Sequence, residues 1–215
     1  MKNLIIKEIR LATHPTNILF LLLSSMLLIP NYPYYVVFFY TTLGIFFMCL
    51  NGRENHDIEY SLQLPVRKAQ LVYARILYST ILEVLQFVIA IPFAILRTKL
   101  IPAGNDVGMD ANIALFGLSL LMMGLFNALF FPRYYQDPSK IGGAFVVGSV
   151  AVFLFISIAE TLTHTAPFFR NQLDTPDPAF LSAKLAVLAV GILAFSALTC
   201  WAARRSARRF VQLDL

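Results

Sequence analysis

The amino-acid sequence predicts an all-α membrane protein with six transmembrane helices, an N-terminal amphipathic helix at the membrane interface and a short cytoplasmic helix between spans two and three. Hydrophobic residues make up 58% of the 215 residues and charged residues 13%, whereas soluble domains are nearer half apolar and a quarter charged. Six apolar stretches follow one another, and the basic residues gather in alternate connections. This composition excludes a soluble domain, a disordered chain, a collagen and a disulfide scaffold.

A single domain covers residues 1–215. Its predicted parts are an interfacial helix at 1–13, spans at about 16–29, 34–50, 71–96, 112–131, 141–162 and 179–203, and a cytoplasmic loop at 51–70.

The first segment mixes apolar residues with charges, as in Ile5-Ile6-Lys7-Glu8-Ile9. Such a pattern is typical of a helix that lies in the membrane interface. No small-residue cleavage site follows the first apolar stretch, so we expect the first span to be retained.

Spans 16–29 and 34–50 are short and are joined by Pro30-Asn31-Tyr32-Pro33, which predicts a hairpin. Two crossing helices and a re-entrant hairpin both agree with this pattern. Either arrangement returns the chain to the side from which it started, so the later topology is the same.

The remaining four spans reach the length of about 20 residues that a bilayer requires. Span 71–96 contains Arg75 and Glu83, and span 112–131 is uncharged and is followed by Pro132. Spans 141–162 and 179–203 carry one charge each, Glu160 and Lys184.

The distribution of basic residues predicts the orientation. Four of the 17 Lys and Arg residues fall on one side, and the other thirteen fall on the side of both termini; the four are Arg97, Lys99, Arg170 and Lys184. The positive-inside rule then places both termini in the cytoplasm. The net charge of +5 is therefore a topology signal and predicts no nucleic-acid partner, and the pairs Arg204-Arg205 and Arg208-Arg209 are expected to anchor the last helix to anionic lipid.

Motifs for catalysis and for metal binding are missing from the sequence. There is no GxxxxGK[ST], GxSxG or HExxH motif, and no metal-ligand spacing involves His14, His56 or His164. Glu160 and His164 are four residues apart, so they form either a proton-handling pair or a solvated pair at the membrane boundary. We therefore expect no enzyme activity and no cofactor in this chain.

Polar residues inside the predicted spans are candidates for a substrate pathway: Glu83, Gln86, Asn127 and Glu160. A carboxylate at the membrane centre is costly and must face protein or water. Glu83 can contact a substrate, or it can accept a hydrogen bond from a neighbouring helix, with Asn127 as the candidate donor.

The loop 51–70 is the most polar part of the chain. Ile58, Leu62 and Leu64 are spaced to form an apolar ridge on a short helix parallel to the membrane. A solvated loop without such a role is the alternative interpretation.

This loop resembles a signature of small type-2 ABC exporter permeases, six-span subunits without an ATPase domain. The matching pattern is Glu54-x-x-Asp57, then Ser61-Leu62-x-Leu64-Pro65-Val66 with a basic pair, then Ala74-Arg75. Arg67 stands where family members usually have serine. A weaker match is Phe131-Pro132-Arg133-Tyr134-Tyr135, but Gln136-Asp137-Pro138 follows where the family tends to have lysine and Phe-Gly.

The resemblance implies a coupling helix that docks on a cytoplasmic ABC ATPase. The docking residues would be Glu54, Asp57, Ile58, Tyr60, Leu62, Leu64, Pro65, Arg67 and Lys68. Two permease copies, as a homodimer or a heterodimer, would join two ATPase subunits, which bind ATP and Mg²⁺. The family exports amphipathic or antimicrobial peptides and other hydrophobic cargo across the bacterial cytoplasmic membrane.

Two other function classes agree with the composition. An ion- or proton-coupled carrier would use Glu83 and Glu160 and should show an inverted repeat, which is not visible. A membrane scaffold or immunity protein would bind its ligand without transporting it.

Overall fold

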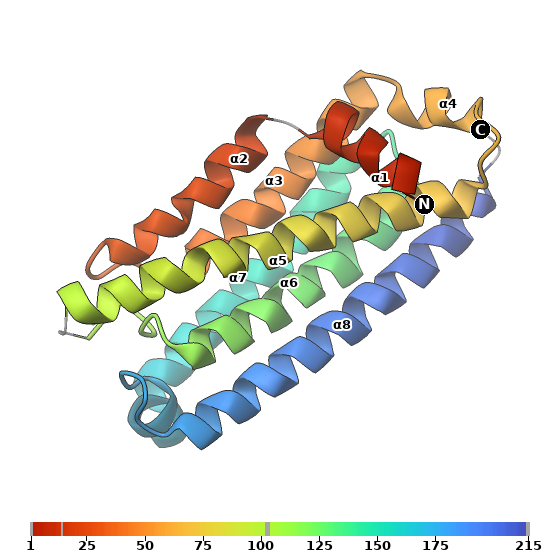
Figure 1. Cartoon of the computed structure of the whole chain (residues 1–215). Coiled ribbons are helices and arrows are strands. Elements are labelled where there is room, and N and C mark those ends of the chain that lie inside the picture. The colour runs from red at the N-terminus through yellow and green to blue at the C-terminus, as the bar shows by residue number, and fades with distance from the viewer. Residues whose placement is uncertain (1, 14, 102–103, 214–215) are drawn as a thin grey trace.

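Figure 1 shows a computed structural model of the chain, which describes residues 2–13, 15–101 and 104–213. Every regular element in these ranges is helical, as predicted. The elements are α1 (Lys2–Lys7), η1 (Glu8–Ala12), α2 (Pro15–Leu22), η2 (Leu23–Leu28), α3 (Tyr35–Glu54), α4 (Asp57–Leu62), α5 (Lys68–Leu100), α6 (Ile113–Tyr134), α7 (Ile141–Thr165), η3 (Phe169–Leu173) and α8 (Leu181–Val211). Met1 of the predicted interfacial helix and His14 lie outside the described residues.

Five helices are long and apolar enough to cross a membrane, namely α3, α5, α6, α7 and α8. The sixth candidate is a bent pair, Asn3–Ala12 and Pro15–Leu28, whose two parts meet at 86°. The second part lies beside α3, while α1 and η1 lie across the end of the bundle (Figure 1). Eight α-helical and six 3₁₀ residues rise about 24 Å, somewhat less than the roughly 30 Å hydrocarbon layer.

The turn between η2 and α3 forms where the prolines predict it. Asn31 adopts a left-handed conformation with φ 53°, which asparagine tolerates better than most residues. The Asn31 side chain accepts a hydrogen bond from the backbone N–H of Asp106 at 3.2 Å, so the turn contacts the loop after α5.

Several helices run past the ends of the predicted spans. α3 continues to Glu54 and takes up the first part of the predicted loop, and α8 continues to Val211. α6 does not end at Pro132 but reaches Tyr134, and α5 is continuous through Pro92. Pro132 lies in the last turn of α6, where it removes one backbone hydrogen bond, and the helix ends two residues later.

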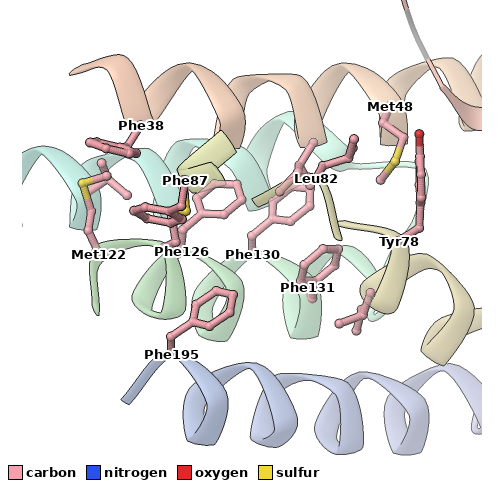
Figure 2. Close-up of a cluster of buried hydrophobic side chains, with 14 of the residues drawn as sticks. Phe38, Met48, Tyr78, Leu82, Phe87, Met122, Phe126, Phe130, Phe131 and Phe195 are labelled. Atoms are coloured by element: carbon pink, nitrogen blue, oxygen red, sulfur yellow. The ribbon is translucent and has the colours of Figure 1, made fainter. Parts of the chain in front are cut away.

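The core lies around α6, the most buried of the five long helices. Phe126 and Phe130 of α6 pack against Gly148 of α7, and Phe38 of α3 stacks on Phe87 of α5 with 4.8 Å between ring centroids (Figure 2). On its other side α6 packs along α8, where Gly117 and Gly191 approach so closely that a Cβ on either residue would overlap the facing helix. α7 and α8 are the least buried long helices, so their outer faces are available to lipid.

Candidate functional site

The short helix predicted between spans two and three is α4, and it lies at the end of the bundle that carries both termini (Figure 1). His56 precedes it in a left-handed conformation with φ 50°, which turns the chain sharply after α3. One face of α4, formed by Asp57, Ile58, Ser61 and Leu62, points inward. Asp57 and Ser61 are buried, and Ile58 and Leu62 pack against the core.

The predicted apolar ridge therefore faces the bundle for the most part. Of its three residues only Leu64 is exposed, at 38%, and the neighbouring Tyr60 is 56% exposed. Both residues lie on the outer side of the segment with the exposed Glu59 and Gln63. The face that can meet another protein is therefore different from the one that the spacing indicated.

Asp57 belongs to a buried group of four charges that we call the charge cluster: Lys7, Glu8, Asp57 and Arg75. Arg75 Nε donates to Glu8 Oε2 at 2.8 Å, and Arg75 Nη2 donates to Asp57 Oδ2. Lys7 Nζ lies 2.6 Å from Asp57 Oδ1 and 3.1 Å from Glu8 Oε1. Two cations thus balance two carboxylates, which allows charges to be buried.

Hydrogen bonds extend the charge cluster to two further residues. Lys7 Nζ donates to Ser61 Oγ at 2.9 Å, and Arg75 Nη1 donates to Tyr134 Oη at 3.3 Å. The guanidinium group of Arg75 lies against Gly52 of α3, where a Cβ would come within 2.8 Å of Nη1. Through these contacts the N-terminal helix, which consists of α1 and η1, is joined to α4, α5 and α6 at one point.

The charge cluster shifts the pKa of Asp57. Burial alone would raise the pKa of Asp57, but the charge of Arg75 and the hydrogen bond from Lys7 outweigh burial and hold this pKa below its ordinary value. Asp57 is therefore ionised at neutral pH and ties α4 to the bundle.

The charge cluster is not predicted by the sequence pattern. The sequence predicts Lys7 and Glu8 on a helix in the membrane interface and Arg75 near one end of a span. The sequence does contain one indication of it, because an arginine within an apolar helix, such as Arg75, needs an acidic partner. The remaining predicted docking residues line the surface: Glu54 and Arg67 are exposed, Pro65 is exposed, and Lys68 Nζ donates to the backbone oxygen of Leu213 at 2.6 Å.

A second polar group lies inside the bundle, where the sequence predicted it. Asn127 Nδ2 donates to Glu83 Oε2 at 3.0 Å, which confirms the predicted partner, and also to Thr199 Oγ1 at 3.1 Å. Gln86 Nε2 donates to Ser24 Oγ at 2.8 Å. These bonds join α5 to α6, α8 and η2, but they satisfy the polar groups only in part. Within the described residues Glu83 Oε1, Gln86 Oε1 and Asn127 Oδ1 are buried without a hydrogen-bond partner.

A mostly apolar groove of about 810 Å³ runs between α5, α6 and α8. Phe87, Ile91 and Ile95 of α5 and Phe116 of α6 line one part of it, and Leu188, Ile192 and Phe195 of α8 line another. Asn112 and Asp177 add polar groups at the end opposite α4.

Glu160 lies apart from Glu83, near the end of α7 opposite α4. Its Oε2 accepts a hydrogen bond from the backbone N–H of Met109 at 3.1 Å, and Gly108 packs directly on the carboxylate. His164 Nε2 lies 3.3 Å from the backbone oxygen of Val107, so the 104–112 loop contacts both residues, although His164 itself is exposed. The predicted pathway residues are thus separated into an interior set and one residue beneath a loop.

The same end holds Asp110 and Asp174 close together. The backbone N–H of Asp110 donates to Asp174 Oδ1 at 2.8 Å. Burial raises the pKa of both carboxyls, and the Asp110 charge raises that of Asp174 further. Among residues 2–13, 15–101 and 104–213 no three His, Cys, Asp or Glu side chains gather in a way that could hold a metal ion.

A bundle of long apolar helices, with a short helix fixed by buried charges at one end, is consistent with a multi-pass membrane protein. The family model described as ABC-2 family transporter protein matches residues 3–203, and the chain belongs to this family. It is therefore a permease subunit of an ABC exporter, and the family implies a partner ATPase. Comparisons with curated proteins and with solved structures gave no match.

Proposed function

We propose that this permease moves a hydrophobic or amphipathic substrate, such as an antimicrobial or toxin-like peptide, across the bacterial cytoplasmic membrane. A separate ATPase, two copies per complex, binds ATP and Mg²⁺ and supplies the energy. A second permease copy, identical or a sister chain, completes the complex. The observation that carries the proposal is the family match over residues 3–203 together with α4, which the charge cluster fixes to the bundle.

The orientation follows from charge. The end with α4 and both termini carries the basic-rich segments, including Arg133, Lys140 and the arginines at the end of α8 (Figure 1). By the positive-inside rule this end faces the cytoplasm, where an ATPase can reach α4.

The outer side of α4 is the proposed docking face, centred on Tyr60 and Leu64. Ile58 and Leu62 support it from the inside, and Asp57 secures it through Arg75. Because the charge cluster joins α4 to α5 and to the N-terminal helix, a displacement of α4 by the ATPase would move these elements together. This is rigid-body transmission, in which packed elements shift as units.

The groove between α5, α6 and α8 supports an amphipathic substrate. Its apolar walls suit a hydrophobic side chain or chain segment, and its volume of about 810 Å³ is within the range of ligand sites. Asn112 and Asp177 line one end, where they already bond to Leu173 and Lys184.

The first experiment is a pull-down of the tagged, full-length chain from native membranes. We expect a protein with a P-loop to co-purify. The variant Tyr60→Asp/Leu64→Asp should reduce its recovery at least about tenfold, since the loss of two buried interface anchors costs more than 1.4 kcal/mol. Val211→Asp is the control, because it puts an aspartate, one of the two charges that the test variant adds, at an exposed apolar position of α8 at the same end.

Equal recovery with both variants would contradict docking on the outer side of α4. In reconstituted vesicles, amphipathic peptides should stimulate ATP hydrolysis by the complex and should accumulate without a proton gradient. Transport that stops when the gradient is dissipated while ATP is present would contradict the exporter proposal.

A further inference from the structure

The last turns of α8 carry an arginine-lined pocket. Trp201, Arg204, Arg205 and Arg208 follow the spacing of three, four and seven residues that places side chains on one side of a helix. Together with Arg209 they line a pocket of about 390 Å³, and no carboxylate belongs to its lining. We call this group the arginine pocket.

The positive charge of the arginine pocket is not neutralised within the part of the chain that the structure describes. The ion pairs found there involve Lys7, Arg53, His56, Arg75, Lys140 and Lys184, and none of the arginines of the pocket. Arg209 Nη1 donates only to uncharged acceptors, Pro132 O at 2.7 Å and Gln136 Oε1 at 2.8 Å. The charges of Arg205 and Arg133 act on Arg209 as well. Mutual repulsion of this kind is relieved when an anion binds.

Apolar residues lead along α8 to the arginine pocket. Val190 and Trp201 are eleven residues apart, as are Leu193 and Arg204, and eleven residues are close to three helical turns. Val190, Leu193 and Trp201 are exposed at 61%, 69% and 48%. One side of α8 therefore changes from apolar to cationic at Trp201, as a bilayer changes from acyl chains to headgroups.

Trp201 marks the depth of this change. Tryptophan prefers the membrane–water interface, and the guanidinium carbon of Arg205 lies 5.2 Å from the centre of its ring. The other arginines follow within two turns, at the level of lipid phosphates. Guanidinium groups bind phosphate oxygens through paired hydrogen bonds.

We propose that the arginine pocket binds the phosphate-bearing headgroup of an anionic phospholipid, whose acyl chains lie along the apolar side of α8. Free phosphate has the same binding chemistry, but it would make no use of the apolar residues that lead to the pocket. This site is more specific than a general attraction of the C-terminal arginines to the membrane, and it does not depend on the ATPase.

The chain has a single tryptophan, so the intrinsic fluorescence reports directly on this site. The full-length protein is reconstituted in phosphatidylcholine vesicles that contain either brominated phosphatidylglycerol or brominated phosphatidylcholine as the quencher. We expect the anionic quencher to occupy the site at least about tenfold more strongly, since each arginine near the surface adds about 1 kcal/mol. The variant Arg204→Gln/Arg205→Gln/Arg208→Gln should lose this preference.

The matched control is Arg10→Gln/Arg53→Gln/Lys140→Gln, which removes three charges from the same end outside the pocket. It should keep the preference, and an equal loss in both variants would show that only overall charge matters. Equal quenching of the wild type by the two brominated lipids would overturn the proposal. So would loss of the preference in 50 mM inorganic phosphate at constant ionic strength, because the ligand would then be free phosphate. The alternative is that an acidic partner protein, and not a lipid, neutralises the arginines. In that case the purified chain would show no difference in quenching between the two lipids, which would also overturn the proposal.

Discussion

At the α4 end the charge cluster holds two carboxylates against two cations, whereas at the opposite end Glu160 and Asp174 accept hydrogen bonds from the backbone N–H groups of Met109 and Asp110. The first arrangement joins segments that are distant in sequence, and each partner is a side chain whose removal leaves the other charge buried. The second holds loops in place with backbone donors, which side-chain substitutions other than proline leave intact. We therefore expect the α4 end to be the more sensitive to mutation and the opposite end the more sensitive to pH.

The largest effect is expected for Arg75→Gln. This variant leaves the carboxylates of Glu8 and Asp57 buried with Lys7 as their one remaining cation in the charge cluster, and breaking a buried pair costs about 3–5 kcal/mol. Thermal unfolding of the purified chain in detergent measures the loss. Lys140→Gln is the control, because its pair with Asp137 is 81% exposed at the lysine and is worth about 1 kcal/mol or less.

The double variant Glu8→Gln/Arg75→Gln should recover part of this loss, because it removes the unpaired carboxylate as well. Strictly additive effects of the two substitutions would contradict a direct interaction between Glu8 and Arg75.

Replacing glycine by alanine should change the stability less than Arg75→Gln does, and in opposite directions at a tightly packed position and at an open one. Gly52→Ala should destabilise the protein by about 1–3 kcal/mol, since the new methyl group would displace a guanidinium that Glu8, Asp57 and Tyr134 hold in place. Gly143→Ala in α7 meets no atom within 4 Å, so the higher helix propensity of alanine should stabilise the protein by up to about 1 kcal/mol. Urea unfolding of both variants tests this, and a stabilised Gly52→Ala variant would refute tight packing around Arg75.

The pH dependence should give the smallest effect, with opposite signs at the two ends. The raised pKa values of Asp110 and Asp174 mean that the folded state binds protons more tightly than the unfolded state there. Their unfavourable contribution is thus complete at neutral pH, and it disappears as pH falls through the folded pKa values toward the ordinary aspartate value of 3.8. The pKa of Asp57 is lowered, so its favourable contribution is complete above 3.8 and is lost as pH falls through its folded pKa.

Unfolding midpoints measured from pH 7 to pH 3 should therefore rise slightly and then fall. Asp110→Asn/Asp174→Asn should remove the rise, and Asp57→Asn should weaken the fall. A midpoint that declines steadily from pH 7 in the wild type would contradict the raised pKa values.

Most of the fold was predictable because lipid imposes a simple rule on apolar length and on the side of basic residues. The bond between Asn127 and Glu83 was predictable for the same reason, since a buried acid requires a partner. The direction in which α4 faces was not predictable from the sequence. The spacing of Ile58 and Leu62 correctly indicates that they share one face of the helix, but not that this face points into the bundle. The orientation of α4 depends on its contacts with Arg75 and, through Arg75, with Glu8. Arg75 and Glu8 are 67 residues apart, so local sequence does not indicate that they pair.

That separation has a consequence for how the protein is made. At about 5–20 residues per second, Arg75 is synthesised roughly 3–13 s after Glu8. During this interval the first two apolar stretches and α4 are synthesised, while Glu8 has yet to meet its partner. The N-terminal helix is thus fixed only after the third long segment begins to emerge, so translation itself sets the order in which the bundle closes.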